Sequence, residues 1–160
     1  MARALVAIGG NLGDRQAVLR SATAAIGRIA GTRVVRASRP IETPPERAAD
    51  GPPFLNGALL LETALGPGEL LRELLAVERR FGRRRAGGRH GGPRTLDLDL
   101  ILFEGRAGRG PGLELPHPRF RGRRFVLQPA AEVAPGMLDP ATGRTLAALL
   151  AAVDAREGGR

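Results

Sequence analysis

An α+β fold, with helices packed on one antiparallel sheet, is predicted by three features of the sequence. The predicted elements run in the order strand, helix, strand, strand, helix, strand, and a last helix follows. This split β-α-β-β-α-β order is typical of a ferredoxin-like antiparallel sheet with helices packed on it. The 160 residues suit one core, and neither a repeat nor a linker divides them, so residues 1–160 are predicted as a single domain.

The first quarter of the chain predicts a strand, a helix and a second strand. Residues 2–8 form an apolar run and are expected to be a strand. Asp14 is expected to cap a helix over residues 15–29, whose apolar residues recur at helical spacing, with Gly31 ending it. Residues 32–39 are the second predicted strand. The glycine turn after the first strand lacks the G-x-G-x-x-G pattern, which disfavours dinucleotide binding.

The next segment predicts a loop, a strand and a helix. Residues 40–53 are rich in proline and are expected to be a long loop, a feature that is usually functional or disordered. Residues 54–63 alternate as a third strand. Pro67 opens a second helix over residues 67–81. Its predicted buried stripe is Leu70, Leu71, Leu74, Leu75 and Val77.

The most informative stretch is PRTLDLDLILF at residues 93–103, which alternates as a strand. One face is predicted to hold Leu96, Leu98, Leu100 and Leu102, and the other Thr95, Asp97, Asp99, Ile101 and Phe103. Carboxylates two residues apart on a strand lie about 6.5–7 Å apart and repel unless a cation lies between them. One or two Mg²⁺ ions shared with a phosphate chain would satisfy Asp97 and Asp99. A half-exposed strand whose acids face water is the alternative.

Two glycine-rich loops and a C-terminal helix complete the predicted elements. Residues 82–93 are expected to be an exposed loop beside the two acids, either a lid over phosphates or a solvated charged loop. Its arginines are Arg83, Arg84, Arg85 and Arg89. Residues 105–112 form a second loop, residues 113–118 a short extended piece, and residues 145–153 an amphipathic helix.

Composition excludes several classes of function. All 25 basic residues are Arg, and the net charge is +9, which predicts an anionic partner. Without Lys there can be no Walker A loop, protein-kinase lysine or Schiff base. Without Cys there can be no disulfide, thiol catalysis or cysteine zinc site. No apolar run approaches membrane-spanning length and no signal-peptide pattern is present, so a cytoplasmic protein is expected.

Four motifs point to one family. They are AIGGNLGD at residues 7–14; ETPP at 42–45 with FLN at 54–56; GPRTLDLD at 92–99; and LPHP at 115–118 with RRFVL at 123–127 and EVAP at 132–135. In order and spacing they resemble the 6-hydroxymethyl-7,8-dihydropterin pyrophosphokinases of folate biosynthesis over nearly the whole chain. The resemblance implies transfer of pyrophosphate from ATP to the hydroxymethyl group of the pterin, with release of AMP.

The resemblance also implies a set of site residues. Asp97 and Asp99 would bind two Mg²⁺ ions and act in catalysis with Arg83 and Arg94. The implied ATP-binding residues are Glu78, Arg83, Arg85, Arg94, Leu100, His117 and Arg123. The implied pterin-binding residues are Thr43, Pro44, Pro45, Phe54, Asn56 and Phe125. Phe54 and Phe125 would stack on the pterin and Asn56 would pair with its edge.

Other interpretations remain open for some residues. Without the resemblance, Phe54 and Phe125 would be core residues and Glu78 an exposed helix acid. The sequence also departs from the family pattern at Gly91, where Trp is frequent, and at Gly10, where Ser is usual. Glu46 stands where an apolar residue is common.

Two rival functions are disfavoured. An RNA-binding module on the same fold would stack bases on sheet aromatics, but the chain has five Phe and no Tyr or Trp. A non-catalytic pterin or nucleotide binder fits poorly with the presence of both aspartates and Arg94. The resemblance implies ATP and the pterin as partners, no nucleic acid or membrane, and a monomer.

Overall fold

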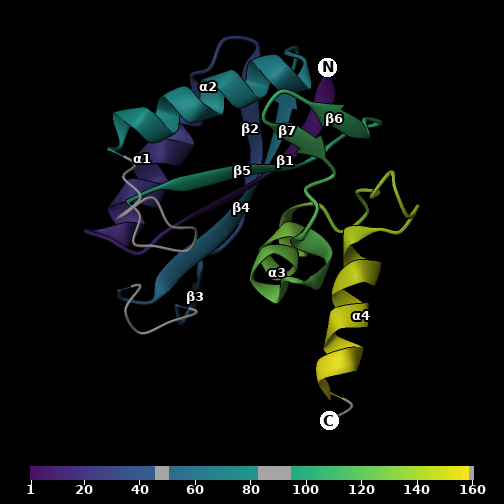
Figure 1. The fold of residues 1–160 in the computed structure, drawn as a ribbon. Helices are drawn as coiled ribbons and strands as arrows, with labels where there is room; N and C mark the ends of the chain where they lie inside the picture. The colour runs from purple at the N-terminus through teal and green to yellow at the C-terminus, as the bar shows by residue number, and fades with distance from the viewer. Residues whose placement is uncertain (46–50, 83–94, 159–160) are drawn as a thin grey trace.

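The computed structural model describes residues 1–45, 51–82 and 95–158. A central antiparallel sheet lies between two helical layers (Figure 1). Helices α1 (Arg15–Gly27) and α2 (Pro67–Arg80) cover one face, and α3 (Arg124–Val133) and α4 (Leu146–Gly158) cover the other. The predicted ferredoxin-like α+β fold is confirmed.

The sheet contains the four predicted strands and one that was not predicted. Its strands are β1 (Ala2–Gly10), β2 (Thr32–Ala37), β3 (Ile41–Thr43), β4 (Phe54–Thr63) and β5 (Asp97–Phe103), in the order β2-β4-β1-β5 with β3 also pairing with β4. The prediction that residues 40–53 are entirely loop was wrong, because Ile41 to Thr43 pair with Asn56 to Phe54. A three-residue strand next to prolines is too short to show a period in the sequence.

Helices α1 and α2 begin where their capping residues predict. The Asp14 side chain accepts a hydrogen bond from the backbone N–H of Ala17 at 3.1 Å. Pro67 occupies the first turn of α2, and Glu69 accepts a hydrogen bond from the Gly66 N–H at 3.2 Å. Helix α1 ends at Gly27, two residues before the predicted end, and Gly31 lies in the following turn at a φ of 73°.

Two residues of the predicted buried stripe of α2 are not buried. Leu70, Leu74 and Val77 lie in the core, but Leu71 is half-buried and Leu75 is 36% exposed. Both line a pocket between α2 and the hairpin of β6 (Gly108–Gly110) and β7 (Leu113–Leu115). Leu71 and Leu75 therefore line this cavity and do not enter the core.

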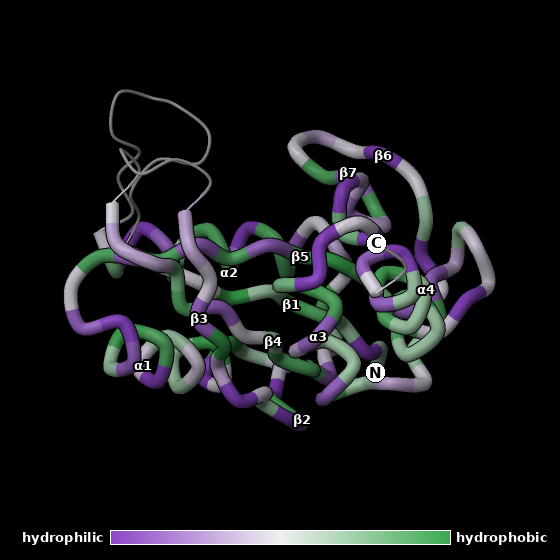
Figure 2. Tube along the Cα trace, turned by 90° about the horizontal axis from the view of Figure 1, so that it is seen from below, coloured by the Kyte–Doolittle hydropathy of each residue, from purple (hydrophilic) through white to green (hydrophobic). Residues whose placement is uncertain are grey.

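Three elements in the second half were missed. Strand β6 lies within predicted loop 105–112, where its three residues include two glycines; in Figure 2 the β6–β7 hairpin stands away from the strongly hydrophobic central strands. The single 3₁₀ turn η3 (Phe120–Gly122) and helix α3 follow. Pro129 lies inside α3, and an internal proline normally argues against a helix.

The predicted alternation of β5 breaks at Ile101. Leu5 of β1 lies opposite Leu102, whereas Val6 lies opposite Leu100, so Ile101 is the extra residue of a β-bulge. After the bulge Leu102 packs on the α3–α4 side and Phe103 on the α1–α2 side, the reverse of the predicted faces. The bulge leaves the faces of Asp97 and Asp99 unchanged.

Candidate functional site

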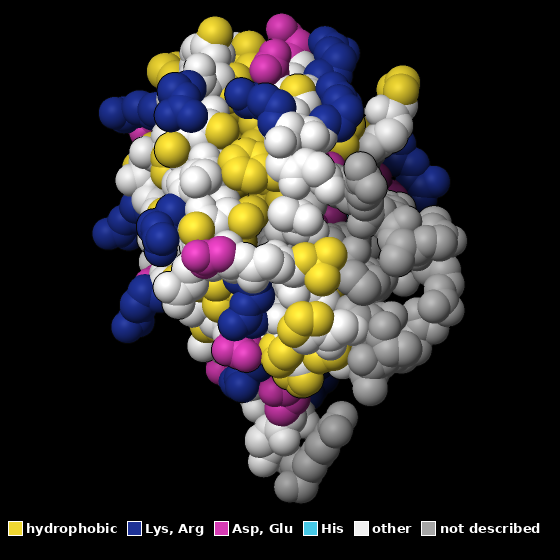
Figure 3. Space-filling model, turned by 90° about the vertical axis from the view of Figure 1, so that its left-hand side faces the viewer, with side chains coloured by type: hydrophobic (Ala, Val, Ile, Leu, Met, Phe, Trp, Pro, Cys, Tyr) yellow, Lys and Arg dark blue, Asp and Glu magenta, His cyan; other side chains and the backbone are white. Residues whose placement is uncertain are grey.

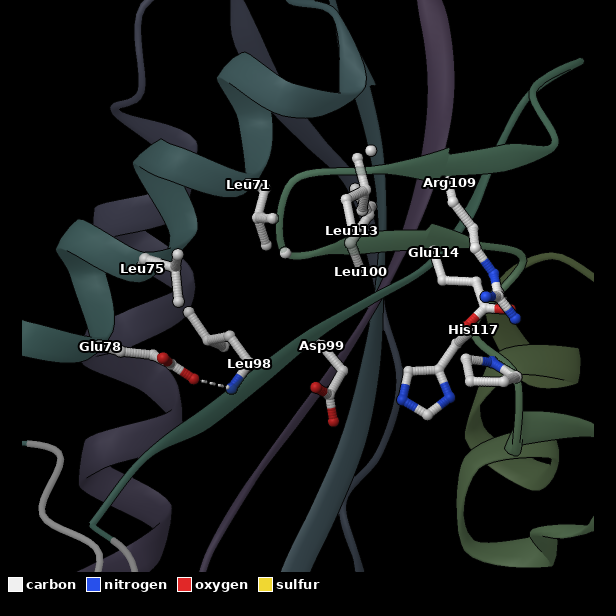
Figure 4. A pocket seen from close by; sticks show the side chains of 13 residues that line it. Leu71, Leu75, Glu78, Leu98, Asp99, Leu100, Arg109, Leu113, Glu114 and His117 are labelled. Carbon is white, nitrogen blue, oxygen red and sulfur yellow. Dashed lines mark hydrogen bonds and ion pairs between the residues drawn. The ribbon is translucent and has the colours of Figure 1, made fainter.

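Two pockets adjoin at β5. The larger, of about 570 Å³, lies between α2, β5 and the β6–β7 hairpin (Figure 4). The smaller, of about 440 Å³, lies between β1, β3, β4, β5, η3 and α3. Asp99 and His117 line both pockets, so a molecule in one would meet a molecule in the other at these two side chains.

Most predicted pterin residues line the smaller pocket. It brings together Thr43 and Pro44 at the end of β3, Phe54 and Asn56 on β4, and Phe125 on α3. Asp97 and Asp99 line the same pocket from β5. Pro45 is not among the lining residues. Phe54 and Phe125 are half-buried and border this cavity, and Phe125 also packs against the core between the sheet and α3 and α4.

Asn56 is held in one orientation. Its Nδ2 donates to the Thr43 Oγ1 at 2.7 Å. On the other side, a Cβ at Gly9 would come within 2.8 Å of the Asn56 Oδ1 and 3.2 Å of the Leu55 carbonyl oxygen. The amide therefore occupies space that only glycine at position 9 leaves open.

Two side chains hold the segment that enters β4. The Asn11 Nδ2 donates to the Pro52 carbonyl at 3.0 Å, and the Arg15 Nη1 donates to the Pro53 carbonyl at 2.8 Å. Neither role was predicted, although Asn11 belongs to the first motif. An asparagine directly after an apolar strand was the signal in the sequence; the structure shows that Asn11 is buried, and a buried amide needs hydrogen-bond partners.

Glu78 is a buried carboxylate, so its interpretation as an exposed helix acid is wrong. Its side chain is 2% exposed, and Oε2 accepts a hydrogen bond from the Leu98 N–H at 2.7 Å (Figure 4). This bond fixes β5 at the residue between Asp97 and Asp99. Glu78 also lines the larger pocket, as do the predicted residues Leu100 and His117.

The pKa of the His117 imidazole is lowered, which favours the neutral ring. Burial lowers the pKa of its imidazole, and the charges of Arg123 and Arg119 lower it further, against opposing effects of Asp97 and Glu114. Nδ1 accepts a hydrogen bond from the Arg119 N–H at 3.2 Å. In the neutral ring the proton is therefore on Nε2, which is a donor. The backbone N–H of His117 donates to the Ile101 carbonyl at 2.9 Å, at the bulge.

Arginines border the smaller pocket. Arg123 lines it with its guanidinium carbon 5.6 Å from the centroid of the Phe125 ring. Arg119 also lines it and was missed by the sequence analysis. The predicted residues Arg83, Arg85 and Arg94 lie outside the described residues. On the face shown in Figure 3 the arginines are interspersed with acidic and apolar side chains.

In the described part of the chain, the side chains at the site that could bind a metal ion are the carboxylates of Asp97 and Asp99. Within residues 1–45, 51–82 and 95–158 no group of three or more His, Cys, Asp or Glu side chains could hold a metal. Asp97 and Asp99 are therefore the available ligands at the site. No described helix is both long and apolar enough to cross a membrane.

The two pockets share the side chains of Asp99 and His117 and therefore lie next to each other at β5. Residues 5–135 match the family model described as 7,8-dihydro-6-hydroxymethylpterin-pyrophosphokinase (HPPK). The chain belongs to this family of pyrophosphokinases, which act in folate biosynthesis.

Relatives with the name 2-amino-4-hydroxy-6-hydroxymethyldihydropteridine pyrophosphokinase are similar over most of the chain. The protein of Synechocystis sp. is 42% identical over 154 residues, covering 94% of this chain and 76% of the relative. That of Pseudomonas aeruginosa is 41% identical over 150 residues, covering 94% and 91%. The chain also matches 19% of the Folic acid synthesis protein fol1 of Schizosaccharomyces pombe, at 34% identity.

Solved structures agree with the fold. A crystal structure of an HPPK-DHPS in complex with substrates superposes with a TM-score of 0.72 at 9% identity, covering 99% of this chain and 44% of that one. The Plasmodium falciparum HPPK-DHPS structure gives 0.65 at 12% identity, covering 100% and 43%. This chain thus spans less than half of those longer proteins.

Proposed function

We propose that the protein transfers pyrophosphate from ATP to the hydroxymethyl group of 6-hydroxymethyl-7,8-dihydropterin, in an Mg²⁺-dependent reaction. The hydroxyl oxygen of the pterin releases its proton and bonds to the β-phosphorus of ATP, and the bond from that phosphorus to the α–β bridging oxygen breaks. The products are the pterin diphosphate and AMP. The observation that carries this proposal is the meeting of two pockets at Asp99 and His117.

The smaller pocket suits the pterin. A flat, polar-edged heterocycle needs aromatic faces and oriented hydrogen-bonding groups. Phe54 and Phe125 supply the aromatic faces, and the amide of Asn56, fixed by Thr43, supplies an oriented edge contact. The hydroxymethyl group would then lie toward Asp97 and Asp99.

The larger pocket suits the nucleotide. Leu71, Leu75 and Leu113 give it apolar walls for a base. Asp99 and His117 mark the end that opens to the smaller pocket, where the phosphates would lie (Figure 4). A neutral His117 can donate from Nε2 to a phosphate oxygen. By resemblance Arg83, Arg85 and Arg94 would grip the triphosphate.

Asp97 and Asp99 fit Mg²⁺. They are hard oxygen donors on one side of β5 and face the place where the substrates meet. Mg²⁺ commonly uses one or two carboxylates and takes its other ligands from phosphates and water, which matches an acid pair with no third protein ligand among the described residues. When bound, two such ions would neutralise phosphate charge and orient the reacting oxygen. The buried Glu78 keeps the acid pair in place through Leu98.

Binding measurements on two variants test which pocket takes which substrate. Phe54→Ala should weaken binding of the pterin about tenfold or more, because it removes a stacking ring, and leave binding of a non-hydrolysable ATP analogue nearly unchanged. Leu75→Asp should do the opposite, because it places a charge on the apolar wall of the larger pocket. Calorimetric titration gives both affinities.

Arg72→Asp is the matched control on α2, since Arg72 is exposed and does not line the larger pocket. Loss of the same ligand in the Phe54 and Leu75 variants would contradict the assignment of the pockets. We further propose that the enzyme is monomeric and cytoplasmic. The exposed Leu75 lines the larger pocket, where a bound nucleotide would cover it.

A further inference from the structure

A buried carboxylate outside the family match pairs with η3, the turn that contributes Phe120 to the smaller pocket. Asp139 lies beyond residues 5–135 and its side chain is 0% exposed. It accepts two hydrogen bonds from Arg121, from Nε at 2.6 Å and Nη2 at 3.0 Å. It also accepts from the Ala141 N–H at 3.0 Å and the Thr142 hydroxyl at 2.8 Å.

The partner of Asp139 belongs to the element that forms one wall of the pocket. Arg121 is the middle residue of η3, and its guanidinium carbon lies 4.9 Å from the centroid of the Phe120 ring. Phe120 lines the smaller pocket, as do Arg119 before it and Arg123 after it. A shift of η3 would therefore move three lining residues together.

The 3₁₀ turn cannot hold this position by itself. It contains three residues and has no side-chain cap at its N-terminus. So short a turn has too few internal hydrogen bonds to be stable alone. Contacts outside it therefore contribute to its position. They are the burial of Phe120, the pairing of Arg121 with Asp139, and the start of α3, where the Val126 and Leu127 N–H groups donate to the Arg123 carbonyl.

Asp139 is itself fixed by a tight turn. Its N–H donates to the Arg144 carbonyl at 2.9 Å, and its carbonyl accepts from the Gly143 N–H at 2.8 Å. Burial alone would raise the pKa of Asp139, but the hydrogen bonds from Arg121, Thr142 and Ala141 lower it below its ordinary value. The carboxylate is thus ionised at neutral pH and forms a bidentate, charge-assisted pair.

We propose that Asp139 is a positioning residue for the reaction: through Arg121 it holds η3 so that Arg119, Phe120 and Arg123 form the wall of the pterin pocket. This inference rests on the proposed function, because it takes the smaller pocket as the pterin site. It assigns a role in substrate binding to residues 139–142, a segment that lines neither pocket.

Steady-state kinetics of Asp139→Asn test the proposal. The KM for the pterin should rise about tenfold, which corresponds to a modest loss of binding energy. The KM for ATP should rise by less than about threefold, because the larger pocket is lined by none of residues 119–125 and only Arg119 and Arg123 would reach the phosphates from the smaller pocket. The assays should be run well below the melting temperature of each variant.

Asp154→Asn is the matched control. It breaks the ion pair of Arg124 with Asp154, which joins α3 to α4 at the surface near η3. This control should keep the KM for both substrates. If Asp139→Asn does not fold, Thr142→Val removes only one of the four hydrogen bonds to the carboxylate and should raise the pterin KM about twofold to threefold.

An unchanged pterin KM in a folded Asp139→Asn protein would overturn the proposal, as would an equal rise in the KM of both substrates. The wild-type protein separates this failure from failure of the proposed function. Pterin-dependent AMP formation by the wild type with a normal KM in the variant would remove only the role of Asp139. No AMP formation by the wild type would remove the proposed function.

Discussion

The imidazole of His117 lies among four charges at the meeting point of the two pockets. Arg119 and Arg123 disfavour its protonation, and Asp97 and Glu114 favour it. Burial adds to the effect of the arginines, so the neutral ring prevails. A neutral donor beside two carboxylates is suited to hold a phosphate oxygen without pairing with the acids.

The pKa of His117 should lie below 6.5 and should rise in Arg123→Gln, because a neighbouring positive charge is removed. NMR titration of the two histidines measures it, with His90→Gln providing the assignment. The pKa of His117 is lower in the folded than in the unfolded protein. The folding stability linked to this group is therefore fully present above the unfolded-state pKa and is lost as pH falls through the folded-state pKa. A pKa that falls further in Arg123→Gln would contradict the arrangement.

At the residue scale, the sequence predicted the site best where the residues form a pattern. Asp97 and Asp99 could be singled out because two carboxylates on one face of a strand repel each other unless a cation lies between them. Glu78 was assigned to the nucleotide side, but its burial could not be predicted, because the Leu98 N–H that it satisfies comes from a different element. Arg119 was missed because one more arginine among 25 gives no signal.

Strand β5 depends on two contacts from other elements. Glu78 of α2 holds the Leu98 N–H, and the His117 N–H pairs with the Ile101 carbonyl at the bulge. The strand therefore keeps its register on both sides of Asp99. A bulge beside a site re-aims side chains without ending the strand.

Glu78→Ala should lower the free energy of unfolding by about 2 kcal/mol or more, because a buried N–H loses a charged acceptor. Denaturant unfolding measures this loss. Glu73→Ala, at an exposed position of the same helix, should change stability by less than about 0.5 kcal/mol. Equal effects of the two substitutions would mean that the bond to Leu98 contributes little.

Strands β1 and β4 meet where Gly9 lies opposite Asn56. Gly9→Ala should weaken pterin binding about tenfold, because overpacking here costs about 1–3 kcal/mol and must displace the Asn56 amide or the strand. ATP binding should be nearly unchanged. Both affinities come from calorimetry.

Gly68→Ala serves as the comparison for Gly9→Ala, because an added Cβ at position 68 would meet no atom within 4 Å. It should leave both affinities as they are. Normal pterin binding by Gly9→Ala would show that the amide of Asn56 does not contact the ligand.

At the scale of the whole molecule, the order of elements was enough to predict an antiparallel sheet with helices packed on it. Several short or interrupted elements were not predicted. Helix α3 was missed because Pro129 interrupts its pattern, and β3 and β6 because three residues cannot show a period. These are the elements that close the two pockets, so the shape of the site depended on tertiary contacts that the sequence does not display.

The net charge of +9 is consistent with the proposed substrates as a whole. Arg119 and Arg123 place positive charge where a triphosphate would meet the acid pair. On the face shown in Figure 3, arginines lie among acidic and apolar side chains.

Product analysis with ATP, Mg²⁺ and 6-hydroxymethyl-7,8-dihydropterin, with and without EDTA, is the most direct test of the proposed reaction. We expect AMP that depends on the pterin, disappears with EDTA and returns with excess Mg²⁺. Asp97→Asn should lose this activity by about a thousandfold while remaining folded. Formation of ADP, or AMP formation that EDTA and Asp97→Asn leave intact, would contradict the proposed reaction.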